Sequence, residues 1–366
     1  MASRSSSAQK LLFPEFPGSA QDSIHPFPST RYQGSKKKIA DWIWGNIRDL
    51  EFTTMLDAFG GTGCISHMLK SHGKSVTYND LLTFNHIIGH ALIENSDTTL
   101  SSEDIDFLLK KHEHVVYPDF IQKTFENIYF TSEENIWLDR IITNIQALFD
   151  KTKQTLALFA LFQACIIKRP YNLFHRANLY VRTNDAVERS FGNKTTWDRP
   201  FEDHFRAFVE EANTAVFDNS QPCRSLNQDA LTIPNEFDLI YIDPPYISQN
   251  GVGTDYLEFY HFLEGISRYG EWLGLIDTKY KHRPIRSEMK NPWTDKNQIK
   301  NKFDELFDHF KDSILVVSYR KDGIPSIETL EKLMKKHKRD VTIRESENYK
   351  YVLSKKTTQE VLLIGF

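Results

Sequence analysis

The chain has 366 residues, 40% of them apolar, and a formal net charge of -4 at pH 7. That apolar content is enough for one large domain or two smaller ones with packed cores. No apolar run is long enough to cross a membrane, and the opening segment MASRSSSAQK lacks the apolar core of a signal peptide, so we expect a soluble cytoplasmic protein. The negative charge argues against a protein that coats nucleic acid, although one basic face would suffice for contact with phosphate.

The three cysteines are scattered along the chain at Cys64, Cys165 and Cys223. None belongs to a CxxC pair or lies at metal-ligand spacing from a histidine, so we predict neither a disulfide framework nor a metal site. We expect these side chains to behave as small, buried apolar residues.

Strand and helix patterns alternate in the first part of the chain. Residues 1–30 are rich in Ser and Pro and predict a flexible arm. Residues 37–48 place isoleucines four apart, which predicts an amphipathic helix. A short strand then leads into a glycine turn over 53–63, a helix follows over 64–73, and a second strand over 74–80 ends on an acid. This order predicts the opening of a nucleotide-binding α/β sheet.

The middle of the chain is mainly helical by pattern. Residues 131–150 begin with a capping box of Thr131 and Glu134, and residues 155–170 predict a buried helix. From 171 to 197 the helical period is lost and aromatic residues alternate with basic ones, which predicts a β-hairpin with long loops.

Strand patterns resume in the last part of the chain, at 237–243, 313–319, 349–353 and 360–366, the last two as a closing hairpin. The simplest architecture is an α/β domain built from residues 31–95 and 223–366. A mainly helical domain, residues 96–222, is then inserted between its two halves.

The turn LDAFGGTG, residues 56–63, places an acid and a phenylalanine before two glycines. Glycines allow a tight turn and a close approach of the backbone to a ligand, and Asp57 can take the charge of an ammonium group. No Gly-Lys-Ser/Thr follows, so a phosphate-binding P-loop is not indicated. Asp80, at the end of the second strand, is placed to bind ribose hydroxyls. Many α/β folds have such a turn, and a solvated strand-end Asp is the simpler reading of Asp80.

The most specific motif is the run Asp243, Pro244, Pro245 and Tyr246 after an apolar strand. Proline cannot donate to a sheet ladder, so the strand ends here on a rigid shelf. An aromatic amine is a poor nucleophile because its lone pair is delocalised into the ring. Hydrogen bonds from that amine to the Asp243 carboxylate and the Pro244 carbonyl would free the lone pair, while Tyr246 stacks on the base. The alternative is a strand that is merely capped by proline.

Two basic runs stand out against the acidic average. Residues 168–199 hold seven Lys and Arg against three acids, a net charge of +4, and residues 278–302 hold eight against two, a net charge of +6. Either run could be a solvated surface, and either could contact phosphate.

These motifs together resemble the adenine-N6 DNA methyltransferases of the DNA adenine methylase type, which include restriction-modification methylases. RYQGSKK, residues 31–37, resembles the cofactor-lid motif, DAFGGTG the S-adenosylmethionine loop and DPPY the catalytic tetrad. The resemblance covers roughly residues 31–90 and 165–366. It implies a Rossmann-like S-adenosylmethionine-dependent methyltransferase sheet of α/β class with an inserted, mainly helical DNA-recognition domain. It also implies methyl transfer from S-adenosyl-L-methionine to the N6 amine of adenine in a short duplex DNA site.

The resemblance assigns roles by position. Lys36 would lie near the carboxylate of the cofactor, Asp80 on its ribose, and Asp229, from the segment NQDA, at its adenine edge. The whole set expected to bind the cofactor is Tyr32, Lys36, Asp57, Phe59, Gly61, Gly63, Asp80, Asp229 and Asp243. The set expected at the reacting amine is Asp243, Pro244, Pro245 and Tyr246. Tyr256 and Tyr260 stand where the family keeps aromatic residues near the flipped base.

A target adenine is buried in the duplex and must be flipped out, which favours a protruding basic and aromatic element. The hairpin region of about 168–200 resembles the DNA-reading region of the family, and 278–302 is a candidate for phosphate contacts. The residues expected to contact DNA there are Arg169, Asn172, Arg176, Asn178, Phe191 and Lys194. Double-stranded DNA is therefore the expected partner, with a cognate restriction endonuclease acting on the same site.

Two other functions stay open on the sequence alone. The acceptor could be adenine in RNA or, with less support because position 243 is not Asn, a protein amide. A non-catalytic DNA-binding protein on the same scaffold is the alternative from another class, and the intact tetrad and glycine turn argue against it.

Overall fold

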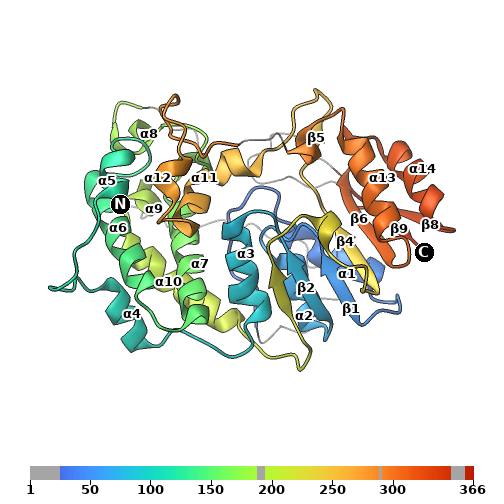
Figure 1. Ribbon diagram of the computed structural model, residues 1–366, viewed down its shortest axis with the longest axis horizontal. Coiled ribbons are helices and arrows are strands. Elements are labelled where there is room, and N and C mark those ends of the chain that lie inside the picture. The colour runs from blue at the N-terminus through green and yellow to red at the C-terminus, as the bar shows by residue number, and fades with distance from the viewer. Residues whose placement is uncertain (1–24, 188–193, 288–290, 348–358) are drawn as a thin grey trace, which may run out of the picture.

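A seven-stranded sheet forms the half of the molecule that is drawn on the right in Figure 1. The computed structural model describes residues 25–187, 194–287, 291–347 and 359–366. The strand order is β3-β2-β1-β4-β6-β9-β8. The first five strands run parallel, and β9 is antiparallel to both of its neighbours. The strands are β1 (Thr54–Asp57), β2 (Ser75–Asn79), β3 (Arg224–Leu226), β4 (Leu239–Ile242), β6 (Ile314–Arg320), β8 (Val341–Glu345) and β9 (Glu360–Gly365).

The central strands are apolar on both faces because helices cover both sides of the sheet. Along β4, Leu239 and Tyr241 enter one core cluster, while Ile240 and Ile242 enter the other. The first cluster receives the helices of the N-terminal part and of the middle of the chain, and the second receives those after residue 290. These helices are α1 (Ala40–Ile47), α2 (Cys64–Ser71) and α3 (Thr83–Gly89) on the first face, and α13 (Ile299–His309) and α14 (Ile327–His337) on the second.

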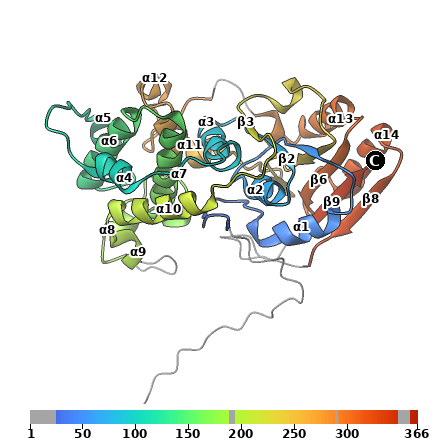
Figure 2. The same cartoon turned by 90° about the horizontal axis from the view of Figure 1, so that it is seen from below.

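The middle of the chain forms a helical half, seen at the left in Figures 1 and 2. Thr131 and Glu134 make the predicted capping box at the start of α6, and the predicted buried helix is α7. Apolar residues of this half belong to the same core cluster as one face of the sheet, so the two halves share one continuous interior. The helices are α4 (Ser102–Leu109), α5 (Phe120–Thr124), α6 (Ser132–Gln146), α7 (Lys151–Ile167), α8 (Tyr180–Thr183), α9 (Lys194–Asp198), α10 (Phe201–Ala215), α11 (Tyr256–Ser267) and α12 (Trp272–Leu275).

The two ends of the chain differ from expectation. The expected strand at 349–353 lies outside the described residues, and the strand that pairs with β9 is β8, at 341–345. At the other end, the described part of the N-terminal arm, residues 25–30, packs on α10, where Ser29 donates hydrogen bonds to Glu211. Among the described residues, no helix is long and apolar enough to span a bilayer.

The β-hairpin predicted for 171–197 is wrong where the chain is described. Residues 168–187 and 194–200 contain a short 3-10 helix at Pro170–Asn172 and the helices α8 and α9, and no strand. The prediction failed because it treated the basic residues as an exposed face. Lys168 and Arg182 are in fact buried and both form ion pairs with Glu134.

Arg169 holds this irregular segment together through hydrogen bonds from the protein interior. Its guanidinium donates hydrogen bonds to the carbonyls of Tyr129, Leu173 and Arg176 and to the Asn178 side chain, and it is 1% exposed. Buried carbonyls of an irregular loop must find donors, and a planar guanidinium can serve several at once. The assignment of Arg169 and Asn178 to DNA contacts is corrected accordingly, because their polar atoms bond to each other inside the protein.

We expect Arg169→Met to lower the free energy of unfolding by about 3 kcal/mol, because it leaves buried carbonyls without their donor. Denaturant unfolding measures the loss. The control is Arg206→Met on α10, where an exposed guanidinium pairs with Glu202 and the expected change is below about 0.5 kcal/mol. Equal effects of the two substitutions would contradict a structural role for Arg169.

Candidate active site

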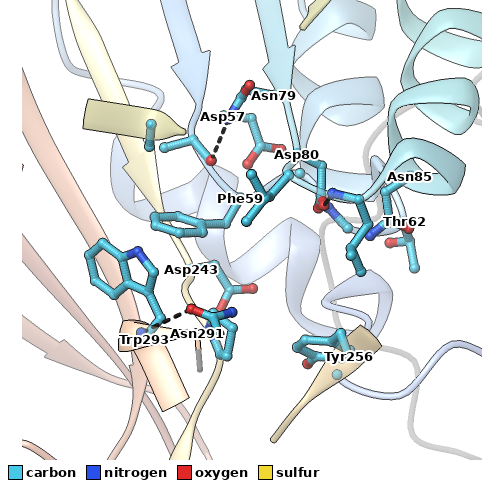
Figure 3. Close-up of a pocket in the computed structure, with 18 of the residues that line it drawn as sticks. Asp57, Phe59, Thr62, Asn79, Asp80, Asn85, Asp243, Tyr256, Asn291 and Trp293 are labelled. Carbon is cyan, nitrogen blue, oxygen red and sulfur yellow. Dashed lines mark hydrogen bonds between the residues drawn. The ribbon is translucent and has the colours of Figure 1, made fainter. Parts of the chain in front are cut away.

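A cavity of about 610 Å³ opens at the carboxyl ends of β1, β2 and β4 (Figure 3). In parallel sheets this edge is where ligands bind, because the loops diverge there and the strand ends present polar groups. Figure 3 shows Asp57, Asp80, Asp243 and Tyr256 around one opening. The predicted site residues that line it are Tyr32, Lys36, Asp57, Phe59, Gly61, Asp80, Asp229, Asp243, Pro245 and Tyr256. Side chains from Tyr32 to Tyr256 are thus brought to one cavity.

Three residues of the predicted cofactor-binding and catalytic sets do not line the cavity, namely Gly63, Pro244 and Tyr246. Gly63 is the N-cap of α2 with φ 75°, a left-handed conformation that favours glycine. It therefore shapes the turn without lining the cavity.

The Asp57 carboxylate is buried at the end of β1, with 1% exposure. One oxygen accepts a hydrogen bond from Ser66 at 2.7 Å, and the other, Oδ1, has no hydrogen-bond partner among the described residues. Burial raises the pKa of Asp57 to about 7, and the hydrogen bond from Ser66 opposes that rise only in part. A buried carboxylate with an unsatisfied oxygen fits a cationic ligand group, such as an ammonium.

Asp80, just beyond β2, braces the glycine turn. Its carboxylate accepts the backbone N–H of Gly61 at 3.0 Å and that of Leu82 at 2.9 Å. Burial raises the pKa of Asp80 to about 6 against the effect of these two bonds. Gly61 itself has φ 51°, so the turn uses the conformational freedom that the sequence indicated.

The Asp243 carboxylate is held by Lys36, from the segment that resembles the cofactor lid. The Lys36 ammonium lies 2.7 Å from each oxygen of Asp243 and 3.5 Å from Oε1 of Glu360. Burial and the charge of Glu360 raise the pKa of Asp243 to about 6, while Lys36 works in the opposite direction. For Lys36, burial favours the neutral amine, but Asp243 and Glu360 outweigh it and raise its pKa.

Tyr246 is buried behind this pair, and its ring contributes no surface to the cavity. Its hydroxyl lies 2.7 Å from Oδ1 of Asp243 and 2.7 Å from Oε1 of Glu360, and it contacts the Lys36 ammonium. Its expected stacking on a base remains a prediction, and one that requires the ring to turn toward the cavity.

Three tyrosines stack beside the cavity, and two of them, Tyr32 and Tyr256, line it. The ring of Tyr32 is 4.5 Å from that of Tyr260 and 5.4 Å from that of Tyr256, with nearly parallel planes in both pairs. Tyr260 is fully buried and its hydroxyl accepts the backbone N–H of Gln33, so it supports the lid segment from inside. Of the two tyrosines predicted near the flipped base, only Tyr256 faces the cavity.

One wall of the cavity comes from the segment before α13 and was not predicted from the sequence. Trp293 packs edge-on against Phe59 at 4.8 Å, and Asn291 stands beside it (Figure 3). Lys302 of the second basic run also lines the cavity. The only sequence signal for this wall was the aromatic Trp293 directly after Asn291 and Pro292. It could not be assigned to the site, because its position in the chain has no fixed relation to the other motifs.

The remaining DNA candidates lie away from the cavity lining. Arg176 and Lys194 are exposed, and Lys194 pairs with Asp198. Tyr171 and Asn172 both have φ near 60°, uncommon for residues with side chains. This loop adjoins α11, because the Phe174 N–H donates to the carbonyl of Phe259. Phe191 lies outside the described residues.

The second basic run adjoins the cavity. Lys279, Lys281, Arg286, Lys296 and Lys300 are exposed, and the run continues directly into the cavity wall at Trp293 and Lys302. Cationic side chains next to a cavity are suited to a polyanionic substrate.

The parallel sheet, the glycine turn and the acids at its strand ends define a Rossmann-like methyltransferase. The chain belongs to the D12 class N6 adenine-specific DNA methyltransferases, whose family model matches residues 32–322. Site-specific methylation of adenine in DNA is accordingly its activity.

Individual relatives agree with the family. The chain is 29% identical over 341 residues to the type II methyltransferase M2.HphI of Haemophilus parahaemolyticus, covering 91% of this chain and 95% of that protein. It is 23% identical to the type II methyltransferase M.CviAII of Paramecium bursaria Chlorella virus 1, over 88% and 93% of the two chains. The type II methyltransferase M.FokI of Planomicrobium okeanokoites is 25% identical over 84% of this chain, which spans 47% of its length.

Gly34 is a sensitive test of the tyrosine stack. It has φ 85°, and a Cβ added there would stand 2.5 Å from the Tyr256 hydroxyl. We expect Gly34→Ala to lower the free energy of unfolding by about 1–2 kcal/mol and to alter the near-UV circular dichroism of the stacked tyrosines. Gly45→Ala, in α1 with open space around it, is the control and should be neutral or stabilising. An unaltered tyrosine signal in Gly34→Ala would show that the stack does not depend on this close approach.

Proposed function

We propose that this methyltransferase uses S-adenosyl-L-methionine and acts on the N6 amine of an adenine flipped out of a short duplex DNA site. One observation carries the proposal. The unpaired oxygen of Asp57 and the carboxylate of Asp243 line the same cavity, so a cationic methyl donor and an amine acceptor can be held face to face. The family membership supports the reaction class.

The residues around the glycine turn fit the proposed cofactor. When bound, S-adenosylmethionine supplies an electrophilic methyl group on a sulfonium. Asp57 would take its ammonium group, Asp80 would accept from ribose hydroxyls, and Asp229 would lie at its adenine edge. Phe59 and Trp293 would supply the apolar wall.

Asp243 is the proposed acceptor of the adenine amine hydrogens. Its carboxylate would draw the amine toward a tetrahedral geometry and expose its lone pair to the methyl group. The carbonyl of Pro244, which does not line the cavity in the free protein, is the proposed second acceptor. Tyr256, at the cavity mouth, and Tyr246, after rotation, would pack on the base and keep the amine in line. The contribution of these residues to methyl transfer is therefore to position the base and to accept hydrogen bonds from its amine.

On the DNA side, we propose contacts from two surfaces, one on the segment that follows α7 and one on the second basic run. Asn172 and Arg176, on the loop that Arg169 braces, are the candidates for base contacts, and Lys194 is a candidate for phosphate. The exposed cations of 278–302 would position the duplex through its phosphates. We further propose that the protein serves restriction-modification beside an endonuclease of the same site, which its type II relatives favour.

We expect Asp243→Ala to reduce transfer of labelled methyl groups to duplex DNA by at least about a hundredfold, because the amine loses its charged acceptor. Cofactor binding measured by calorimetry should stay within a few-fold. The matched control is Asp312→Ala. This exposed carboxylate lies just before β6, at the edge of the sheet opposite the cavity. Structured RNA assayed in parallel should receive no label. Turnover retained in Asp243→Ala, or label in RNA alone, would overturn the proposal.

Affinity for the cofactor should fall as the pH is lowered through about 7. The pKa of Asp57 is about 7 in the free protein, and an ammonium ligand favours the ionised carboxylate, so binding below that pH must release a proton. The loss should approach about tenfold per pH unit below the pKa and vanish above it. Calorimetric titrations between about pH 6 and about pH 8 measure it. Asp57→Asn should bind weakly with a flatter profile, and an unchanged slope in that variant would assign the proton to another group, such as Asp80.

A further inference from the structure

Glu360 is a carboxylate without solvent exposure at the first position of β9. It pairs with Arg320 in the antiparallel register of β6 and β9, and it does not line the cavity. Burial of an ionised carboxylate is costly unless charges and hydrogen bonds compensate it. The groups that compensate the buried charge of Glu360 therefore indicate its role.

Two of the contacts described for its side chain, those with Tyr246 and Lys36, lead to Asp243. Oε1 of Glu360 accepts hydrogen bonds from Tyr246 and from Ser318, each at 2.7 Å. Its cationic neighbour is Lys36 at 3.5 Å, and that ammonium is closer to Asp243. Two carboxylates thus share one ammonium and compete for the one hydroxyl hydrogen of Tyr246.

This competition decides how electron-rich Asp243 is. With Glu360 present, the Tyr246 hydrogen and part of the Lys36 charge are drawn to the back of the site, so Asp243 keeps lone pairs for the amine. Without that second negative charge, Lys36 and Tyr246 would both act on Asp243 alone. Asp243 would then be a weaker acceptor of the amine hydrogens, because acceptor strength follows basicity.

We propose that Glu360 is a positioning residue for methyl transfer: through Lys36 and Tyr246 it keeps the Asp243 carboxylate available and strongly accepting toward the target amine. The inference rests on the role proposed for Asp243. It assigns a function to the last strand of the sheet, which none of the sequence motifs includes.

Other groups around the pair bear on the test. The titratable and charged residues facing Asp243 and Glu360 from the lid segment, β1, β4, α11 and β6 are Lys36, Asp57, Tyr241, Tyr246, Tyr256 and Tyr319. Burial raises the pKa values of Tyr241, Tyr256 and Tyr319, so these phenols stay neutral over the range of the assay. Asp57 is kept ionised by measuring at saturating cofactor.

The experiment is the pH dependence of single-turnover methyl transfer with cofactor and DNA both saturating, for the wild type and Glu360→Gln. Glutamine keeps the shape and an acceptor oxygen but removes the charge. We expect two effects together. In the plot of rate against pH, the plateau rate falls at least about tenfold because Asp243 becomes a weaker acceptor. The acid limb, where the rate falls as the pH is lowered, moves to lower pH by about one unit because Asp243 loses a negative neighbour.

A fold defect alone would lower the rate and leave the acid limb where it is. The matched control is Asp139→Asn, which removes a buried carboxylate that caps α5 in the helical half. We expect its acid limb to coincide with that of the wild type. An unshifted limb, or one shifted to higher pH, in folded Glu360→Gln would overturn the inference, while loss of activity in Asp243→Ala would leave the proposed function intact.

Glu360→Asp provides a second test should the glutamine variant not fold. It keeps the charge but withdraws it from Tyr246 and Lys36 by one methylene. The expected result is an acid limb near that of the wild type with a plateau rate reduced several-fold at unchanged cofactor affinity. A plateau rate equal to that of the wild type would overturn the inference.

Discussion

The structure depends on carboxylates that are removed from water at the carboxyl edge of a parallel sheet. Asp57, Asp80 and Asp243 end or follow neighbouring strands and face one cavity, and burial raises the pKa of each. Such an arrangement costs free energy in the empty protein. The proposed ligand groups, a cation and an amine that donates hydrogen bonds, would offset this cost of burying the carboxylates.

Lys36 connects this edge to the N-terminal segment. It stands 207 residues from Asp243 in the chain, yet its ammonium contacts both oxygens of that carboxylate. The Tyr32 stack with Tyr256 and Tyr260 ties the same segment to α11. The segment that resembles a cofactor lid therefore contacts both Asp243, the proposed acceptor of the amine hydrogens, and the tyrosines of α11.

The helical half is joined to the sheet through a continuous apolar interior rather than through a flexible linker. The ion pairs of Glu134 with Lys168 and Arg182, and the hydrogen bonds of Arg169, fix the irregular segment that follows α7. A loop with two residues at left-handed φ can keep its shape there because buried donors satisfy its carbonyls. Sequence-dependent reading of DNA needs surfaces of fixed shape, so this anchoring is compatible with the DNA contacts proposed for the segment.

The sequence by itself determined β1, β2, β4, β6 and β9, the glycine turn and the acids at the strand ends, because these depend on local patterns: apolar strands, a turn that needs positive φ, and prolines that end a strand. The edge strands β3 and β8 were not predicted. The sequence also predicted the capping box at Thr131 and the buried helix α7, again from neighbours along the chain. Tertiary structure alone decided which charges are buried. Lys168, Arg169 and Arg182 looked like a basic face and are interior, because partners distant in the chain accept their hydrogen bonds. The placement of Trp293 on the cavity wall and of Glu360 behind Asp243 likewise follows from strand order and long-range packing, which no local pattern encodes.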